Sequence, residues 1–72
     1  MKMDRQELVE GGLFTVADAE DFSGMKKSTL YKLMERGDIP YAKIGSARRI
    51  PKLGLANYLA KCIVKSEEDQ EV

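Results

Sequence analysis

The spacing of apolar residues predicts two helices joined by a tight turn. The first covers residues 16–23 and the second covers residues 27–36. In each, the inward side chains recur three or four positions apart, as they do on one face of a helix. Gly24 and Gly37 follow directly, and glycine tolerates the left-handed conformation at a helix end. The predicted inward faces consist of Val16, Ala19, Phe22, Ser23, Leu30, Leu33 and Met34.

The start of the first helix has a capping signal. Thr15 and Asp18 have the spacing of a capping box, in which the hydroxyl accepts a hydrogen bond from the third backbone N–H and the carboxylate reaches back to the cap. Met25 and Lys26 then form the turn between the helices. Two helices joined in this way have the outline of a helix-turn-helix.

A short β-hairpin follows the second helix. Ile39 precedes Pro40 and is therefore extended. Residues 41–44 alternate in polarity, residues 45–47 form a turn, and residues 48–50 return as a second strand. We therefore expect a two-stranded hairpin that acts as a wing beside the helices.

Alternation along the two strands predicts what each face of the hairpin carries. Lys43 and Arg49 are expected on the polar face. Arg48 has the same parity as Ile50, so its stem is expected to pack inward while its guanidinium reaches water. The expected apolar face consists of Ala42, Ile44 and Ile50.

A third helix is predicted over residues 52–65, with Pro51 just ahead of it, where a missing N–H costs little. Gly54 inside this helix costs on the order of 1 kcal/mol relative to alanine. Cys62 is the single cysteine, so it makes no internal disulfide, and we expect it as a small buried hydrophobe in a reducing cytosol. The predicted buried stripe consists of Leu55, Tyr58, Leu59 and Cys62, with Ile63 beside it.

These elements predict one small domain with two flanking segments. We expect residues 1–12 to be a flexible N-terminal extension that closes with Gly11-Gly12, and residues 66–72 to be a disordered acidic tail. Residues 13–65 then form a winged helix-turn-helix, mainly α-helical with a small two-stranded β-hairpin. A chain this short buries only about 60% of its unfolded surface, so we expect marginal stability.

The net charge of zero hides three blocks of alternating sign. Residues 1–24 sum to −4, residues 25–65 to +8 and residues 66–72 to −4. The central block holds ten Lys or Arg against two acidic residues. This segregation favours a polyanion-binding surface with two acidic flanks. Composition alone leaves a solvated basic face without a partner equally open.

The side chains present argue against catalysis, metal binding and membrane insertion. The chain has no histidine, which is the commonest general base and metal ligand. Its glycines fit isolated turns rather than a phosphate-binding loop, and no run approaches about 18 consecutive apolar residues. We therefore expect no enzymatic activity, no cofactor, no metal and no membrane span.

The basic block coincides with the second helix and the hairpin. In a helix-turn-helix, the first turn of the second helix faces base edges, where lysine pairs with guanine and Ser or Thr with either base type. Lys27, Ser28 and Thr29 occupy that turn, and Tyr31 and Lys32 follow one turn later, placed for sugar and phosphate. The predicted DNA-binding residues are Lys26, Lys27, Ser28, Thr29, Tyr31, Lys32, Lys43, Ser46, Arg48 and Arg49.

A series of short motifs spans residues 13–60. They are Phe14-Thr15-Val16, Asp18-Ala19, Gly24-Met25, Lys27-Ser28-Thr29-Leu30-Tyr31-Lys32-Leu33, Arg36-Gly37-Asp38-Ile39-Pro40, Lys43-Ile44-Gly45, Arg49-Ile50-Pro51 and Leu55 to Leu59. The series resembles the excisionase-type branch of the MerR-like winged helix-turn-helix domains. The resemblance implies a major-groove helix, a wing on the adjacent minor groove, and a role in recombination of a mobile element or in transcription.

Three positions depart from that family pattern. Lys26 stands where the family often has serine, which removes the usual cap of the second helix. Ser46-Ala47 stand where the wing tip is often basic. Arg48 stands where an aromatic residue is common, which leaves it either a packing residue or a DNA ligand.

The role and the partners stay open at this stage. We expect double-stranded DNA as the partner, in the cytoplasm with the nucleoid. Because a single module buries only roughly 600–1,000 Å², we also expect a second copy on adjacent sites or an integrase or other recombinase. The alternative is a protein-interaction module, such as an antirepressor, that uses the same fold without DNA. An RNA binder is less favoured, because RNA readers stack bases on aromatic side chains and only 7% of this chain is aromatic.

Overall fold

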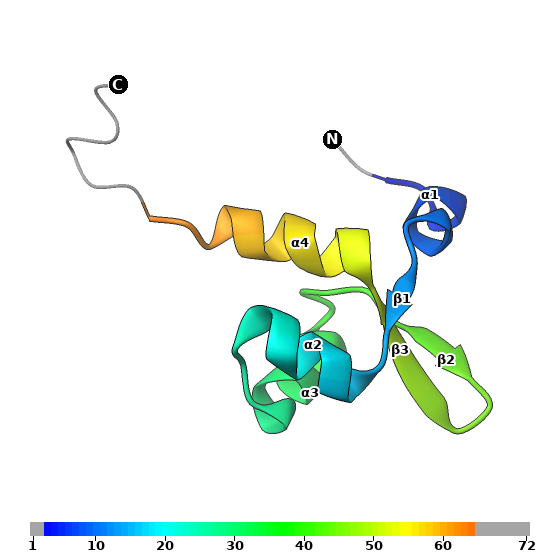
Figure 1. Cartoon of the computed structure of the whole chain (residues 1–72), viewed down its shortest axis with the longest axis horizontal. Helices are drawn as coiled ribbons and strands as arrows, with labels where there is room; N and C mark the ends of the chain where they lie inside the picture. Colours follow the sequence, from blue (N-terminus) through cyan, green and yellow to red (C-terminus); the bar gives the residue numbers. More distant parts are fainter. Residues whose placement is uncertain (1–2, 65–72) are drawn as a thin grey trace.

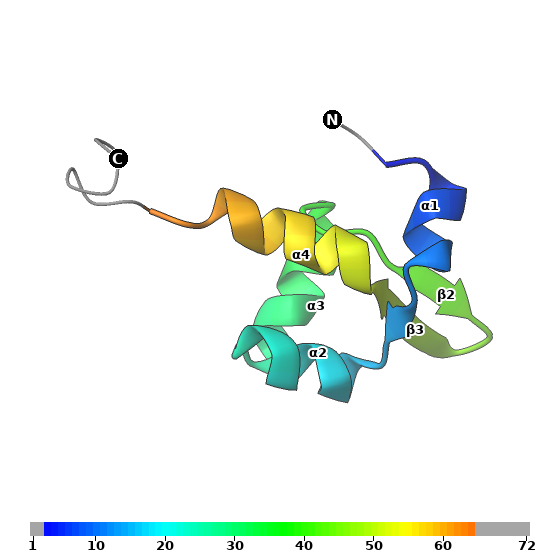
Figure 2. The ribbon, with the colours of Figure 1, turned by 45° about the horizontal axis from the view of Figure 1, so that its top comes forward.

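The computed structural model describes residues 3–64, which fold into four helices and three short strands (Figure 1). In chain order these are α1 (Arg5–Glu10), β1 (Leu13–Phe14), α2 (Val16–Ser23), α3 (Lys27–Arg36), β2 (Ala42–Ile44), β3 (Ala47–Pro51) and α4 (Lys52–Lys61). α4 lies above α2 and α3 in both views, and the hairpin of β2 and β3 extends away from these helices (Figure 2). The mainly helical architecture with a small antiparallel hairpin agrees with the predicted fold class.

α2 and α3 begin and end at the predicted residues. Gly24 and Gly37 end them in the left-handed conformation, with φ of 74° and 80°. The hydroxyl of Thr15 accepts the predicted hydrogen bond from the Asp18 N–H, at 3.0 Å. Among the described residues the return bond from the Asp18 carboxylate is not formed, so half of the predicted capping box is present.

The core lies where α2, α3 and α4 meet the central strand β3. α3 contributes three buried side chains, all of them predicted, whereas α2 contributes the small Ala19. Ile39 lies in the segment that connects α3 to β2 and is also buried. Its burial was not predicted, because residues of connecting segments are usually exposed. The buried apolar residues are Ala19, Leu30, Leu33, Met34, Ile39, Ile50 and Leu55.

The sheet has three strands, one more than predicted. The strand order is β1-β3-β2, and both pairs are antiparallel. β1 pairs Leu13 with Pro51 and Phe14 with Ile50. A strand of two residues shows no alternation along the sequence, so pairing with β3 is what defines it.

α4 is shorter than the predicted helix over residues 52–65. It ends at Lys61, with Cys62 as its C-cap, and Cys62 is exposed. The expectation of a buried cysteine is therefore wrong. Leu55 anchors α4 in the core, but from Ala60 onward the described residues are exposed, because the helix runs past the elements that would cover it.

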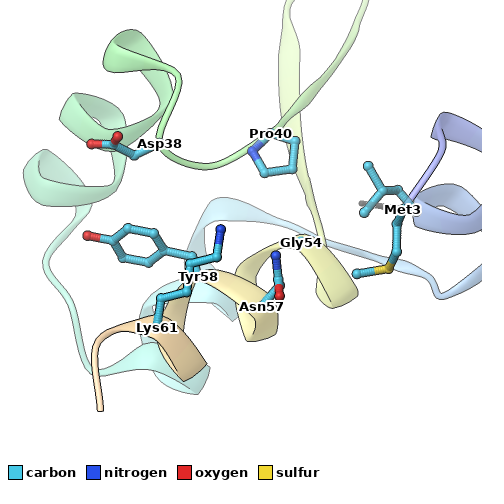
Figure 3. Close-up of a pocket in the computed structure, with 8 residues that line it drawn as sticks. Met3, Asp38, Pro40, Gly54, Asn57, Tyr58 and Lys61 are labelled. Atoms are coloured by element: carbon cyan, nitrogen blue, oxygen red, sulfur yellow. The ribbon is translucent and has the colours of Figure 1, made fainter. Parts of the chain in front are cut away.

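Gly54 has a packing reason to be a glycine. It is buried in the first turn of α4 and lies against Pro40 (Figure 3). A Cβ atom at position 54 would lie 2.5 Å from Cγ of Pro40 and 3.5 Å from Cδ2 of Leu8. The helix-propensity cost of this glycine is thus offset by close contact between α4 and the segment that follows α3.

The N-terminal segment, which was expected to be a flexible extension, contains the helix α1. The Asp4 carboxylate accepts from the Glu7 N–H at 2.8 Å, and the Glu7 carboxylate accepts from the Asp4 N–H at 3.0 Å. α1 lies beside the start of α4, where its Leu8 is half-buried. Six residues are too few to show a helical period, but the capping-box spacing was a readable signal. The domain limits of 13–65 stay a prediction, and the predicted acidic tail, 66–72, lies outside the described residues.

Candidate nucleic-acid interface

Ser23 fixes the turn between α2 and α3. Its hydroxyl donates to the carbonyl of Ala19 at 2.7 Å and accepts from the N–H of Met25 at 3.1 Å. The end of α2 is thereby tied to the first residue after the Gly24 cap. Ser23 was predicted on the inward face of the helix, but its role in the turn was not predicted. A serine directly before a helix-ending glycine was the available signal.

The first turn of α3 stands clear of the core. Lys26, Lys27, Ser28 and Thr29 are all exposed, and Leu30 is the first buried residue. The Lys26 side chain makes no capping hydrogen bond, in line with the departure noted from the family pattern. A helix N-terminus has unpaired N–H groups and partial positive charge. This end of α3 therefore suits phosphate oxygens or the acceptor edges of bases.

One turn later, α3 presents two of the predicted residues very differently. Lys32 is exposed, whereas Tyr31 is half-buried and packs against the core. Nζ of Lys27 lies 6.0 Å from the centroid of the Tyr31 ring, and Cζ of Arg48 lies 5.1 Å from it. The ring that was expected to lean on a DNA sugar is thus engaged inside the protein.

The hairpin places its basic residues on different faces from those predicted. Lys43 lies opposite Arg48, and Ala42 lies opposite Arg49. Directly opposed residues of an antiparallel pair share a face. Lys43 therefore lies with Arg48, and Arg49 lies on the other face. The prediction that Lys43 and Arg49 share a face is wrong.

The length of the turn explains the error. A three-residue turn over 45–47 would place Arg48 opposite Ile44, but the turn has two residues and Ala47 lies opposite Ile44. Gly45, with φ of 63°, permits the tight turn. A slip of one residue moves every side chain of a strand to the other face. Ile50 is consequently buried, while Ile44 is 57% exposed.

The Arg48 side chain makes most of its contacts with other residues of the protein. Its side chain is 24% exposed, and Nη2 donates to the Glu35 carboxylate at 3.0 Å. Cζ lies 5.1 Å from the centroid of Tyr31 and 4.7 Å from that of Tyr41. Nη1 is buried and has no hydrogen-bond partner among the described residues. The stem packs inward as predicted, but the guanidinium does not extend into water.

The remaining wing residues divide between the two faces. Lys43 is exposed and lies on the same face of the hairpin as Arg48, the face that contacts α3. Ser46 is exposed at the tip of the hairpin. Arg49 is half-buried on the opposite face, where its Nη1 donates to the Arg48 carbonyl at 3.2 Å. The structure therefore places Lys43 on the same face of the wing as Arg48, which contacts α3, and leaves Arg49 on the other face.

A groove of about 440 Å³ lies between α1, α4 and the segment after α3 (Figure 3). Apolar residues, with Pro40 and Leu8 among them, line one part, and Asp38, Tyr58 and Lys61 give it polar groups. The pKa of Tyr58 is raised above its ordinary value, chiefly by a side-chain hydrogen bond with Cys62. Asp38 follows the C-terminal end of α3, so the length of that helix separates the groove from the exposed first turn.

Within residues 3–64 no helix combines the length and apolar character needed to cross a bilayer. In the same range, no three His, Cys, Asp or Glu side chains come together in a way that could hold a metal ion.

Comparison with known protein families identifies the family of this chain. A family model described as a helix-turn-helix domain matches residues 13–63, a segment that runs from β1 past the end of α4. All the predicted DNA-binding residues lie inside it. Neither the curated proteins nor the solved structures gave a match to this chain.

Proposed function

Since the chain belongs to the helix-turn-helix family, which includes excisionase-like DNA-binding domains, we propose that it binds double-stranded DNA sequence-specifically. In this proposal α3 enters the major groove and the β2–β3 hairpin is the wing on the neighbouring backbone. The observation that supports it most is the first turn of α3, where Lys27, Ser28 and Thr29 are exposed together beside the turn that Ser23 holds. The proposed role is binding without catalysis.

The residues divide into those that read bases and those that hold phosphate. Lys27 is placed for guanine acceptors, and Ser28 and Thr29 for either base type. Lys26 and Lys32 flank them as phosphate ligands. On the wing we assign the phosphate contact first to Lys43, because it lies on the α3 side of the hairpin. Ser46 at the tip is a further contact, and Arg49 on the far face is a minor one.

Two biological roles fit this binding. One is that of an excisionase, or recombination directionality factor, and the other is that of a transcriptional regulator at a promoter. A single module buries roughly 600–1,000 Å² of its surface on DNA. Either role therefore needs a second contact to raise the affinity of the protein for its site. We propose a second copy on an adjacent site, or an integrase or other recombinase, as its source. The same proposal places the protein with the nucleoid in the cytoplasm.

Salt dependence tests the proposal. A duplex is selected from a random-sequence pool with the full chain, and its Kd is measured by fluorescence anisotropy over a series of salt concentrations. With about four to six phosphate contacts, the log–log slope is expected to be roughly −4 to −5. A scrambled duplex of the same composition is expected to bind more weakly. A slope near zero, or equal binding of the two duplexes, would contradict sequence-specific DNA binding.

The groove between α1 and α4 favours a second candidate function, that of a protein-interaction module. It is open, partly apolar and remote from the first turn of α3. An antirepressor-like protein would use such a surface to bind another protein and would need no DNA. This candidate predicts that no duplex from the pool is enriched at any salt concentration, so the same selection separates the two functions.

A further inference from the structure

One half-buried cation joins the two elements that are proposed to contact DNA. Arg48 of β3 contacts Tyr31 and Glu35 of α3, and it also contacts Tyr41, just ahead of β2. These four residues are called the Arg48 cluster below. Lys27, in the base-reading turn, lies over the same Tyr31 ring at 6.0 Å. Together with Lys27, the cluster is therefore a continuous set of contacts from the first turn of α3 to β3 of the wing.

The guanidinium group suits this position for physical reasons. It is planar, so its face can lie over aromatic rings while its edge donates to a carboxylate. A lysine ammonium is a compact point charge without that shape. Because Glu35 lies 3.0 Å away, the charge of Arg48 is already paired, and its side chain is mostly shielded from solvent. These contacts leave it poorly placed to bind a phosphate.

Little else holds the outer part of the hairpin. None of the residues from 41 to 49 is fully buried, and the buried residues of β3 are Ile50 and Pro51 at its inner end. Ile44, the large apolar side chain near the tip, is mostly exposed. Apolar packing thus anchors the wing at its base, and the Arg48 cluster is what connects its middle to α3.

We propose that Arg48 is a positioning residue that sets the spacing between the base-reading turn of α3 and the phosphate-binding side of the wing. Arg48 then determines sequence preference without touching DNA. This inference rests on the proposed function, in which α3 reads bases and the wing holds phosphate. When the cluster is lost, the wing no longer constrains how α3 sits in the groove, so the preferred duplex loses affinity and other duplexes do not.

A charge-neutral double variant tests this role. Arg48→Gln combined with Glu35→Gln removes the ion pair and the guanidinium without changing the net charge. The full chain is titrated with the duplex selected by the wild type and with its scrambled version, at several salt concentrations. The expected loss is about tenfold for the selected duplex, the order of one weakened base contact. Affinity for the scrambled duplex and the salt slope are expected to stay unchanged.

Lys43→Gln is the matched control, because Lys43 lies opposite Arg48 on the same face and is exposed. It is expected to weaken both duplexes by similar factors and to reduce the salt slope by about one unit. Circular dichroism at the titration temperature checks that each variant is folded. Should the double variant not fold, Tyr41→Leu removes one exposed ring of the cluster and is expected to cause the same selective loss.

The outcomes separate the inference from the proposed function. If the double variant lowers the salt slope as Lys43→Gln does, Arg48 is a phosphate ligand and the inference is overturned while DNA binding stands. If a folded double variant, or Tyr41→Leu in its place, keeps the full preference for the selected duplex, the inference is likewise overturned. If the wild type itself lacks either the salt dependence or the preference for the selected duplex, the proposed function fails and the inference fails with it.

Discussion

The helix-turn-helix and the wing belong to one domain, but different interactions hold each of them in place. α2 and α3 are joined by fully buried side chains, with Ala19 and Leu30 both at 0% exposure. The outer hairpin is joined to α3 by the ion pair of Arg48 with Glu35 and by the contact of the Arg48 guanidinium with the Tyr31 ring, and the same guanidinium lies near the Tyr41 ring. Apolar packing is non-directional and scales with buried area, whereas the Arg48 cluster depends on a few oriented contacts. The first arrangement decides whether the domain folds, and the second decides how its parts are placed.

The largest expected effect is that of Leu30→Ala. Leu30 is fully buried in α3, and its truncation is expected to cost about 2–5 kcal/mol of unfolding free energy. In a domain this small such a loss can unfold the protein. Thermal unfolding followed by circular dichroism measures it. An unchanged melting temperature would show that α3 is not held by this core.

Lys27→Ala is expected to act on binding rather than on stability. Lys27 is exposed in the first turn of α3, so the melting temperature should hardly change. Binding to the selected duplex is expected to weaken by about 1–3 kcal/mol, with relaxed preference at about one base pair. Titration of single-site duplex variants measures that preference. An equal loss of affinity for the selected and scrambled duplexes would show that Lys27 contacts phosphate, and it would contradict the proposal that α3 reads bases.

Thr15→Ala tests how the helix-turn-helix begins. The Thr15 hydroxyl caps α2 through the Asp18 N–H, and its loss is expected to cost about 1 kcal/mol of stability. Asn at position 15 serves as the control, since it is a strong N-cap residue and should retain most of the stability. Chemical denaturation of the three proteins compares them. Equal stability of the alanine variant and the wild type would mean that packing alone sets the start of α2.

The smallest effect is expected from Ile44→Ala on the wing. Ile44 has the size of a core residue, but it lies on the exposed face of β2. Surface substitutions of this kind usually change stability by less than about 0.5 kcal/mol. Compared under the same conditions as Leu30→Ala, it should differ little from the wild type. A loss near that of Leu30→Ala would place Ile44 in a packed face and would contradict the contrast between the two regions.

The elements predicted correctly are those specified by neighbours in the sequence. α2 and α3 have their predicted bounds because a glycine follows each helix and apolar residues recur with helical spacing inside it. The exposed residues at the start of α3 follow from the same periodicity. Even α1, which was not predicted, has a local signal in the Asp4 and Glu7 capping box. Local propensity and capping act within a few residues, so they can be read along the chain.

The faces of the wing depended on contacts that the sequence pattern does not encode. A turn shorter by one residue moved Arg49 to the far face and placed Lys43 with Arg48, because side chains alternate along a strand. β1 exists through its pairing with β3. Arg48 and Glu35 are 13 residues apart in the chain and 3.0 Å apart in space. Periodicity along the chain was enough to predict the helix-turn-helix and the exposed first turn of α3. Strand register and long-range packing determined which basic residues of the hairpin lie on the α3 side, because these depend on how distant segments of the chain meet.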